Sequence, residues 1–151
     1  MRVLLVEDNA RMADEFRRML ESMERTEVVA VARTQQEALA WLRLHPDGWD
    51  LALVDLFLQQ GHGFEVLRHC RKLRRDQRAV VVTNYTRDPV REHARQAGAD
   101  AVFDKSFELD ALVDYCVEFC RSLDARFRPP GGLAAVSHAA HQRHARPRTL
   151  R

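Results

Sequence analysis

The sequence lacks long apolar runs. No stretch reaches the roughly eighteen consecutive apolar residues that a membrane-spanning helix needs, so we expect no membrane contact. The apolar run in the N-terminal segment MRVLLVEDN is also too short for a signal peptide, and two acidic residues follow it directly. The sequence therefore predicts a cytoplasmic protein.

Cysteine is scarce and its spacing matches no zinc pattern. The chain has three cysteines, Cys70, Cys116 and Cys120, an odd number that gives no disulfide framework. Cys116 and Cys120 stand four residues apart in a helical stretch, and we interpret them as small apolar residues on one helix face. A redox or metal role is the alternative.

Acidic residues are missing from the end of the chain. Residues 125–151 contain six arginines and no aspartate or glutamate. Taking these six from the 24 lysines and arginines of the chain leaves 18 basic residues against 22 acidic ones in residues 1–124, a net charge of about −4. Apolar periodicity also stops at Pro129. We therefore predict a folded domain over residues 1–123 and a basic, disordered tail over residues 124–151.

This tail is too short for a helix-turn-helix or an enzymatic domain, so we expect output through protein–protein contacts. Its arginines and its three histidines could attract nucleic acid or bind a metal. We expect neither, because isolated basic tails are usually only solvated. Nucleic acid therefore remains the weaker alternative for this segment.

Short apolar runs alternate with longer amphipathic stretches through the rest of the chain. The runs predict strands at about 3–6, 28–32, 51–54, 79–82 and 101–103, and the stretches predict helices at about 9–23, 34–44, 64–73, 88–98 and 106–123. The strands are uniformly apolar, as in a parallel sheet covered on both faces. Right-handed crossovers then give an α/β fold with a doubly wound (βα)5 sheet.

Polar residues mark the starts of these expected helices. Asn9, Thr34 and Ser106 stand at positions that favour a helix cap. Asp88 precedes Pro89, which predicts a cap followed by proline at the first helical position.

Charged and hydroxyl side chains follow the ends of the expected strands. Glu7 and Asp8 follow the first strand, Asp55 the third, Thr83 the fourth and Lys105 the fifth. With the strand order 2-1-3-4-5, these side chains converge at the carboxyl edge of the sheet. Three carboxylates at one point repel strongly unless a cation joins them, and their oxygen ligands favour Mg²⁺. Each residue alone is ordinary, but the set is not.

The chemistry of such a set is phosphoryl transfer. As a carboxylate, Asp55 is a nucleophile that can form an acyl phosphate. A metal ion and Lys105 would stabilise the charge that spreads over the phosphoryl oxygens. Asp8 would bind the metal directly, and Glu7 would orient a metal-bound water.

Four segments, VLLVEDN, LVDLFL, VVVTNY and AGADAVFDKS, resemble the signatures of the response-regulator receiver domain of two-component signalling. The resemblance covers residues 1 to about 123. Within the family, the chain is similar to the single-domain chemotaxis regulators. The spacings agree with it, with 28 residues from Asp55 to Thr83 and 22 from Thr83 to Lys105. It implies a flavodoxin-like three-layer sandwich with strand order 2-1-3-4-5.

The resemblance also implies a phosphorylation-dependent switch. Asp55 would accept a phosphoryl group from a histidine kinase or a phosphotransfer protein, and a downstream protein effector would sense it. Mg²⁺ would be held by Glu7, Asp8, Asp55 and the backbone carbonyl of Phe57. Thr83 would be the switch hydroxyl, and Lys105 would bridge to the phosphate. Such a protein is no enzyme in the usual sense, because it catalyses only its own phosphorylation and dephosphorylation.

The chain departs from the family in its loops. Gln59 follows Leu58 where many receivers carry proline, a common variant. Ser106 follows the lysine where the family usually has proline in a cis bond. A cis bond to a non-proline residue costs about 3–4 kcal/mol, so the Lys105–Ser106 bond is either strained or trans with a rearranged loop.

Three further positions modulate the expected switch. The family's switch aromatic would lie at position 102, which is Val102, and Phe103 should point to the other face of its strand. Coupling from Thr83 to the surface is then weaker or uses another residue. Phe57 and Tyr85 stand two residues after Asp55 and Thr83, where they border the phosphate. We hypothesise that these rings slow hydrolysis of the acyl phosphate.

The last predicted helix carries a broad apolar stripe that Val113, Val117 and Cys120 widen. It suggests a homodimer or partner face on the last two helices, against the simpler reading of a broad buried face. A phosphorylation-independent receiver-like interaction module is the alternative to the switch. A haloacid dehalogenase phosphatase is rejected, because Phe57 stands where that class has its second aspartate.

Overall fold

The computed structural model describes residues 1–71 and 76–126. Strands and helices alternate through this part of the chain, as the sequence predicts. The strands are β1 (Arg2–Val6), β2 (Glu27–Ala32), β3 (Leu51–Val54), β4 (Arg78–Thr83) and β5 (Ala101–Asp104). The helices are α1 (Ala10–Glu21), α2 (Gln35–Leu44), α3 (Gly63–Arg71), α4 (Val90–Ala97) and α5 (Leu109–Arg126).

The strands form one sheet in the order β2-β1-β3-β4-β5, and every neighbouring pair is parallel. This confirms the predicted order. Val54, at the end of β3, lies opposite Val6 of β1 and Val81 of β4. The residues that follow these three strands therefore emerge side by side at the carboxyl edge.

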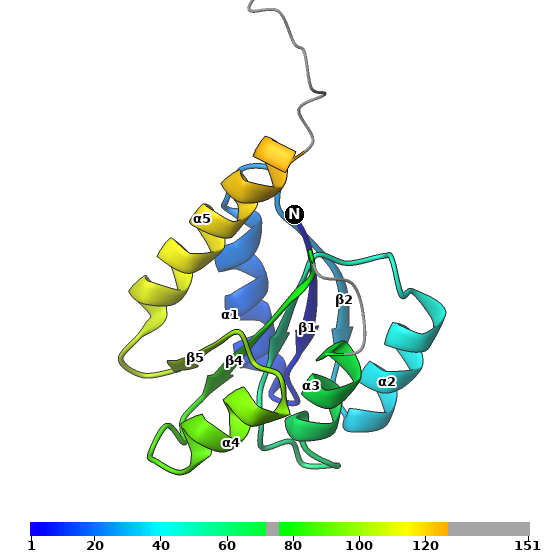
Figure 1. Ribbon diagram of the computed structural model, residues 1–151, viewed down its shortest axis with the longest axis vertical. Helices are drawn as coiled ribbons and strands as arrows, with labels where there is room; N and C mark the ends of the chain where they lie inside the picture. Colours follow the sequence, from blue (N-terminus) through cyan, green and yellow to red (C-terminus); the bar gives the residue numbers. More distant parts are fainter. Residues whose placement is uncertain (72–75, 127–151) are drawn as a thin grey trace, which may run out of the picture.

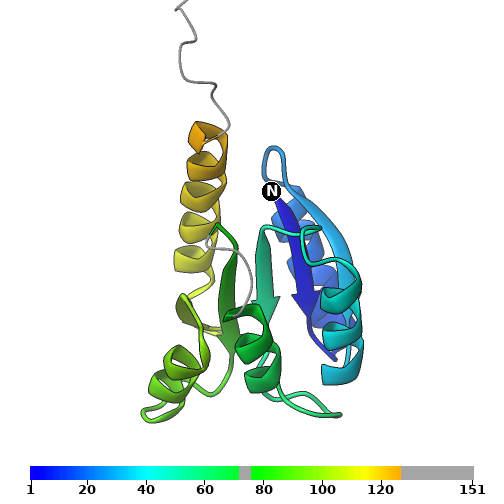
Figure 2. The same cartoon turned by 45° about the vertical axis from the view of Figure 1, so that its right-hand side comes forward.

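Helices cover both faces of the sheet, which confirms the three-layer sandwich. Helices α1 and α5 lie on one face, and α2, α3 and α4 lie on the other (Figures 1 and 2). Along β1, Val3 and Leu5 join the core under α1 and α5, whereas Leu4 and Val6 join the opposite core. Both sets are buried, which explains why the strands are uniformly apolar rather than alternating.

Two of the predicted caps are present. The Asn9 side chain accepts a hydrogen bond from the Met12 N–H at 3.0 Å, and the Thr34 hydroxyl accepts one from the Glu37 N–H at 3.1 Å. Each bond satisfies one of the free N–H groups in the first turn. These caps start α1 and α2 immediately beyond the carboxyl edge.

The other two predicted caps are wrong. Pro89 itself takes the cap position of α4, and it makes no side-chain cap bond because its ring carries no acceptor. Ser106 lies in a turn, and α5 begins three residues later, at Leu109. The carboxylate of Asp104 accepts the N–H bonds of that turn instead.

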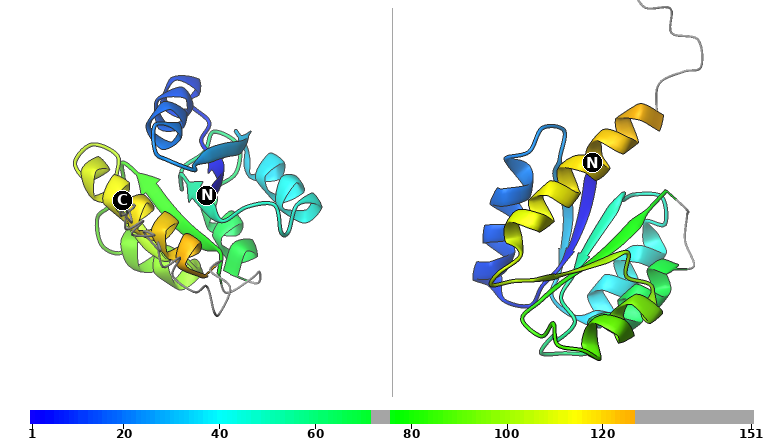
Figure 3. Two further views of the ribbon diagram at one scale, coloured as in Figure 1. Left: turned by 90° about the horizontal axis from the view of Figure 1, so that it is seen from above. Right: turned by 60° about the vertical axis from the view of Figure 1, so that its left-hand side comes forward.

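Helix α5 continues to Arg126, slightly beyond the predicted domain boundary (right view of Figure 3). The rest of the predicted tail lies outside the described residues. Among the helices of residues 1–71 and 76–126, none is long and apolar enough to cross a membrane.

Candidate functional site

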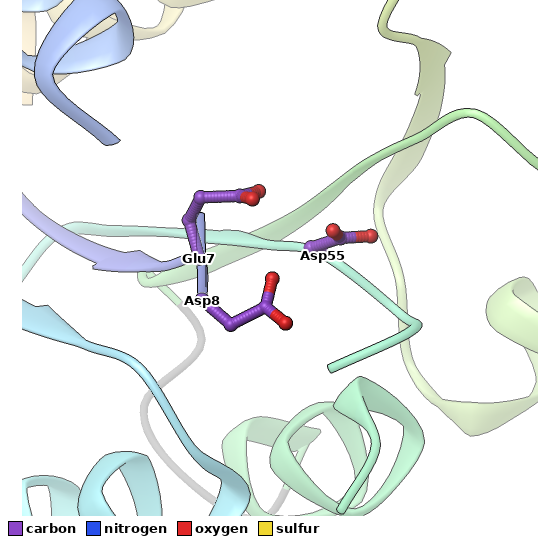
Figure 4. Close-up of side chains that lie close together, drawn as sticks. All are labelled: Glu7, Asp8 and Asp55. Atoms are coloured by element: carbon purple, nitrogen blue, oxygen red, sulfur yellow. The ribbon is translucent and has the colours of Figure 1, made fainter. Parts of the chain in front are cut away.

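Three carboxylates meet at the carboxyl edge of the sheet. Glu7 and Asp8 directly follow β1, and Asp55 directly follows β3, its neighbour. One oxygen of each lies within 4.8 Å of the others, and Figure 4 shows the three carboxylates close together. Glu7 is 1% and Asp55 8% exposed, whereas Asp8 lies further toward solvent. The prediction that these residues converge is confirmed by this geometry.

Lys105 joins this cluster from the end of β5. Its ammonium group lies 2.7 Å from Glu7 Oε2 and 2.8 Å from Asp55 Oδ2. The Lys105 N–H also donates to the Thr83 carbonyl at 3.0 Å, which ties it to the end of β4. Within the described residues the cis peptide bond is Asp88–Pro89, so the Lys105–Ser106 bond is trans. Lys105 is in place even without the family's proline.

Burial and charge shift the pKa values of this ion pair. Burial raises the pKa of Glu7 above its ordinary value, against the opposing effect of the Lys105 ammonium. Burial acts to lower the pKa of Lys105, but the hydrogen bonds and charges of Asp55 and Glu7 outweigh it and raise that pKa. Lys105 is therefore a firmly charged group at neutral pH.

Backbone N–H groups orient the acidic side chains. The Gln59 N–H donates to Asp8 Oδ2 at 2.8 Å, and the Asn9 N–H donates to Glu7 Oε1 at 3.2 Å. A proline at position 59 would have no N–H to donate. The departure from the family at this position therefore supplies an extra hydrogen bond to Asp8.

Thr83 ends β4 and is fully buried. Its hydroxyl accepts a hydrogen bond from the Tyr85 N–H at 3.3 Å, and it does not line the pocket around the carboxylates. Val102 lies in the core under α2, α3 and α4, whereas Phe103 faces the opposite core. The predicted opposite orientation of these two neighbours is confirmed.

Two aromatic rings border the pocket. Phe57 is 45% and Tyr85 60% exposed, and their ring centroids lie 4.6 Å apart in an edge-to-face contact. Both residues line the pocket that contains Glu7, Asp8, Asp55 and Lys105. Four lining residues were not predicted to belong to the site: Asn9, Met12, Asn84 and Ser106. Asn9, Asn84 and Ser106 directly follow predicted site residues, so the strand-end rule could have found them.

The residues present fit a hard divalent cation. Each of the three carboxylates offers one oxygen atom, these atoms all lie within 4.8 Å of one another, and Mg²⁺ takes oxygen ligands of this kind. Phe57 lines the same pocket, which fits the predicted use of its carbonyl. The donor set is all oxygen, as Mg²⁺ prefers.

Solved structures of receiver domains share this fold. The response regulator domain of Thermotoga maritima CheB is 23% identical, with a TM-score of 0.66, and the match covers 85% of this chain and 98% of that one. A CheY-like receiver domain protein from Methanospirillum hungatei is 29% identical, with a TM-score of 0.63 and coverage of 80% and 97%. The phosphorylated cyanobacterial phytochrome response regulator RcpA is 24% identical, with a TM-score of 0.66 and coverage of 86% and 98%.

A search of curated proteins finds no match to this chain. A search against protein families, in contrast, matches residues 3–116 to the response regulator receiver domain. The matched range includes all of the strand-end residues described above. On this match and on the fold, the chain belongs to the response regulator receiver domain family.

Proposed function

We propose that this protein is a phosphorylation-dependent signalling switch of a two-component system, with Asp55 as the phosphate acceptor. The observation that carries the proposal is the pairing of Asp55 with the Lys105 ammonium at 2.8 Å, beside Glu7 and Asp8. A cation and an acidic cluster around one nearly buried carboxylate are what acyl phosphate formation requires.

In the proposed reaction, an oxygen of the Asp55 carboxylate attacks the phosphorus of a phosphohistidine. The new O–P bond forms as the P–N bond breaks, and the bonding electron pair stays with the imidazole nitrogen. The Lys105 ammonium group moves from the carboxylates to a phosphoryl oxygen and stabilises the negative charge of that oxygen. Mg²⁺, when held by Glu7, Asp8, Asp55 and the Phe57 carbonyl, supplies further charge neutralisation.

Thr83 would report the phosphoryl group to the rest of the fold. Among the contacts described, its hydroxyl accepts a 3.3 Å hydrogen bond from the Tyr85 N–H, and its own O–H could donate to a phosphoryl oxygen. Turning this hydroxyl toward the phosphoryl group would pull on the segment between β4 and α4. The partner that reads this change would be a downstream protein, and the donor a histidine kinase or phosphotransfer protein.

A homodimer through α4 and α5 remains part of the proposal. Part of the apolar stripe that suggested it, however, lies against the segment that follows α1 within the same chain. Cys120 is buried, and its thiol lies 3.8 Å from the Glu24 carbonyl, beyond the end of α1. Val117 borders a pocket with Met23 on this same side. Sedimentation with and without phosphodonor tests whether dimers form.

The proposal is tested by titrating the ¹⁵N-labelled protein with beryllium fluoride, a phosphoryl mimic, in the presence of Mg²⁺. We expect the amide signals of residues 55, 83 and 105 to shift. These shifts should be absent without Mg²⁺ and in Asp55→Asn. An unchanged spectrum in the wild type would instead support the phosphorylation-independent interaction module.

A further inference from the structure

The turn that carries Lys105 is built around one carboxylate. Asp104 Oδ1 accepts hydrogen bonds from the Ser106 N–H at 2.8 Å and the Phe107 N–H at 3.2 Å. These two bonds close the turn directly after Lys105. The bond from position 106 requires a residue with an N–H, which proline lacks.

The same carboxylate is fixed from a second direction. The Thr86 hydroxyl donates to Asp104 Oδ2 at 2.8 Å, and Thr86 lies three residues after Thr83. Asp104 therefore links the segment after β4 to the turn after β5. Thr83 directly precedes the first of these segments and Lys105 lies in the second, and both residues are expected to contact the phosphoryl group.

A further ion pair holds the backbone of Asp104. Its N–H donates to Glu108 Oε1 at 3.1 Å, and that carboxylate also pairs with the Arg91 guanidinium. Arg91 in turn donates to the carbonyls of Thr86 and Val102, each at 3.0 Å. Every residue that supports Asp104 thus comes from α4, α5 or the segments next to them.

We propose that Asp104 is a positioning residue that holds Lys105 on Asp55 and Glu7, in place of the proline that usually follows the family's lysine. This inference rests on the proposed function, because Lys105 acts only if Asp55 accepts a phosphoryl group. A lysine side chain is long and flexible, so its ammonium group reaches two carboxylates reliably only when its backbone is fixed. The hydrogen bonds from Thr86 and then Ser106 lower the pKa of Asp104, which keeps it a charged acceptor.

The sequence offers a direct probe, because it contains only two lysines, Lys72 and Lys105. In protein labelled with ¹⁵N-lysine, Lys105→Arg identifies the Lys105 ammonium signal. Hydrogen exchange of that ammonium with water reports whether it stays paired. The same samples give the phosphorylation rate by intact mass with acetyl phosphate and Mg²⁺.

Three variants separate positioning from folding. Asp104→Ala removes all acceptor atoms, whereas Asp104→Asn keeps an oxygen that can accept the two turn bonds. Thr86→Val removes only the hydroxyl donor to Oδ2, and it decides the question should Asp104→Ala fail to fold. Thermal unfolding shows which variants are folded.

We expect Asp104→Ala to exchange its Lys105 ammonium protons about tenfold faster and to be phosphorylated about 10- to 100-fold more slowly, as small misplacements of reacting groups allow. Asp104→Asn should stay within about threefold of the wild type, because its side-chain oxygen still accepts the turn bonds. Thr86→Val should speed the exchange detectably.

Wild-type exchange and wild-type phosphorylation in a folded Asp104→Ala would overturn the inference, as would unchanged exchange in Thr86→Val. Should the wild type itself take up no phosphoryl group, the proposed function fails. In that case, faster ammonium exchange in Asp104→Ala still supports the role of Asp104 in placing Lys105.

Discussion

Lys105 illustrates how one residue decides the electrostatics of the site. Its side chain is only 9% exposed, and its ammonium group pairs with Glu7 and Asp55 at the same time. Without it, two nearly buried carboxylates would face each other and Asp8 with no protein cation between them. Removing one partner of a buried pair costs more than the pair itself contributes.

We therefore expect Lys105→Met to lower the free energy of unfolding by about 3 kcal/mol in EDTA. Added Mg²⁺ should restore part of this loss, because a divalent cation also neutralises the carboxylates. Urea denaturation with and without Mg²⁺ measures both effects. An unchanged free energy of unfolding in EDTA would contradict the assigned pairing.

The hypothesis that Tyr85 and Phe57 lengthen the lifetime of the phosphorylated state can be tested at the residue scale. The two rings contact each other beside the pocket, so they would restrict the approach of water to Asp55. Tyr85→Ala should therefore speed hydrolysis of the acyl phosphate several-fold, as followed by intact mass after removal of the donor. Phe107→Ala is the matched control, because this ring is 90% exposed and does not line the pocket. Equal lifetimes in Tyr85→Ala and wild type would refute the hypothesis.

The charge of Asp104 gives a pH dependence with a defined sign. Hydrogen bonds from Thr86 and Ser106 hold the pKa of Asp104 below its ordinary value of 3.8. Its stabilising contribution is therefore fully present above the unfolded pKa and is lost as pH falls through the folded pKa. We expect the difference in unfolding free energy between wild type and Asp104→Asn to be constant near neutral pH and to shrink below about pH 4. Denaturation at a series of pH values measures it, and a difference that grows toward acid would contradict this sign.

At the residue scale, the sequence predicted the charged cluster because each member ends a strand, and strand ends in a parallel sheet share one edge. Asp104 also ends a strand but was not singled out. Its role depends on the N–H groups of Ser106 and Phe107, which become visible only once the turn has a conformation. The hydrogen bond from Gln59 to Asp8 was missed for the same reason.

At the scale of elements, α3 is packed directly against the backbone of Asp55. Gly63, its first residue, donates its N–H to the Leu56 carbonyl at 2.8 Å. A Cβ atom at this position would lie 2.3 Å from the Asp55 carbonyl oxygen and 2.8 Å from a methyl carbon of Val54. Such contacts can be relieved only by moving backbone, and that backbone carries Asp55.

We expect Gly63→Ala to lower the free energy of unfolding by about 1–3 kcal/mol, as overpacking does, and to slow phosphorylation. Gly48→Ala is the control, because the atoms nearest to its Cβ would all belong to exposed His45. Urea denaturation and phosphorylation rates of both variants test this. A Gly63→Ala protein as stable and as active as Gly48→Ala would show that α3 can shift without disturbing Asp55.

The elements themselves were predictable where apolar runs and side-chain caps define them. Strand β3 has the predicted bounds, and Asn9 and Thr34 cap the helices they were expected to cap. The predicted starts of α4 and α5 were two and three residues too early, because backbone turns, not the predicted side-chain caps, lead into these helices. A polar side chain does accept the N–H bonds before α5, as the sequence pattern predicted. That side chain belongs to Asp104 and not to Ser106, whose own N–H donates to it.

At the scale of the whole molecule, the sheet has one hydrophobic core on each of its two faces. Helices α1 and α5 cover one core and α2, α3 and α4 the other, and the carboxyl edge lies between these layers (Figure 1). Arg91 and Glu108 connect α4 to the start of α5 across the end of β5. A change at Thr83 or Lys105 would thus reach two helices on opposite faces of the sheet.

The central claim is that Asp55 accepts a phosphoryl group, and intact mass tests it most directly. The protein is incubated with acetyl phosphate, with and without Mg²⁺, beside Asp55→Asn. We predict a gain of about 80 Da in the wild type, the mass of one phosphoryl group, that requires Mg²⁺ and is absent in the variant. No gain under conditions that label another receiver domain, or an equal gain in Asp55→Asn, would contradict the claim.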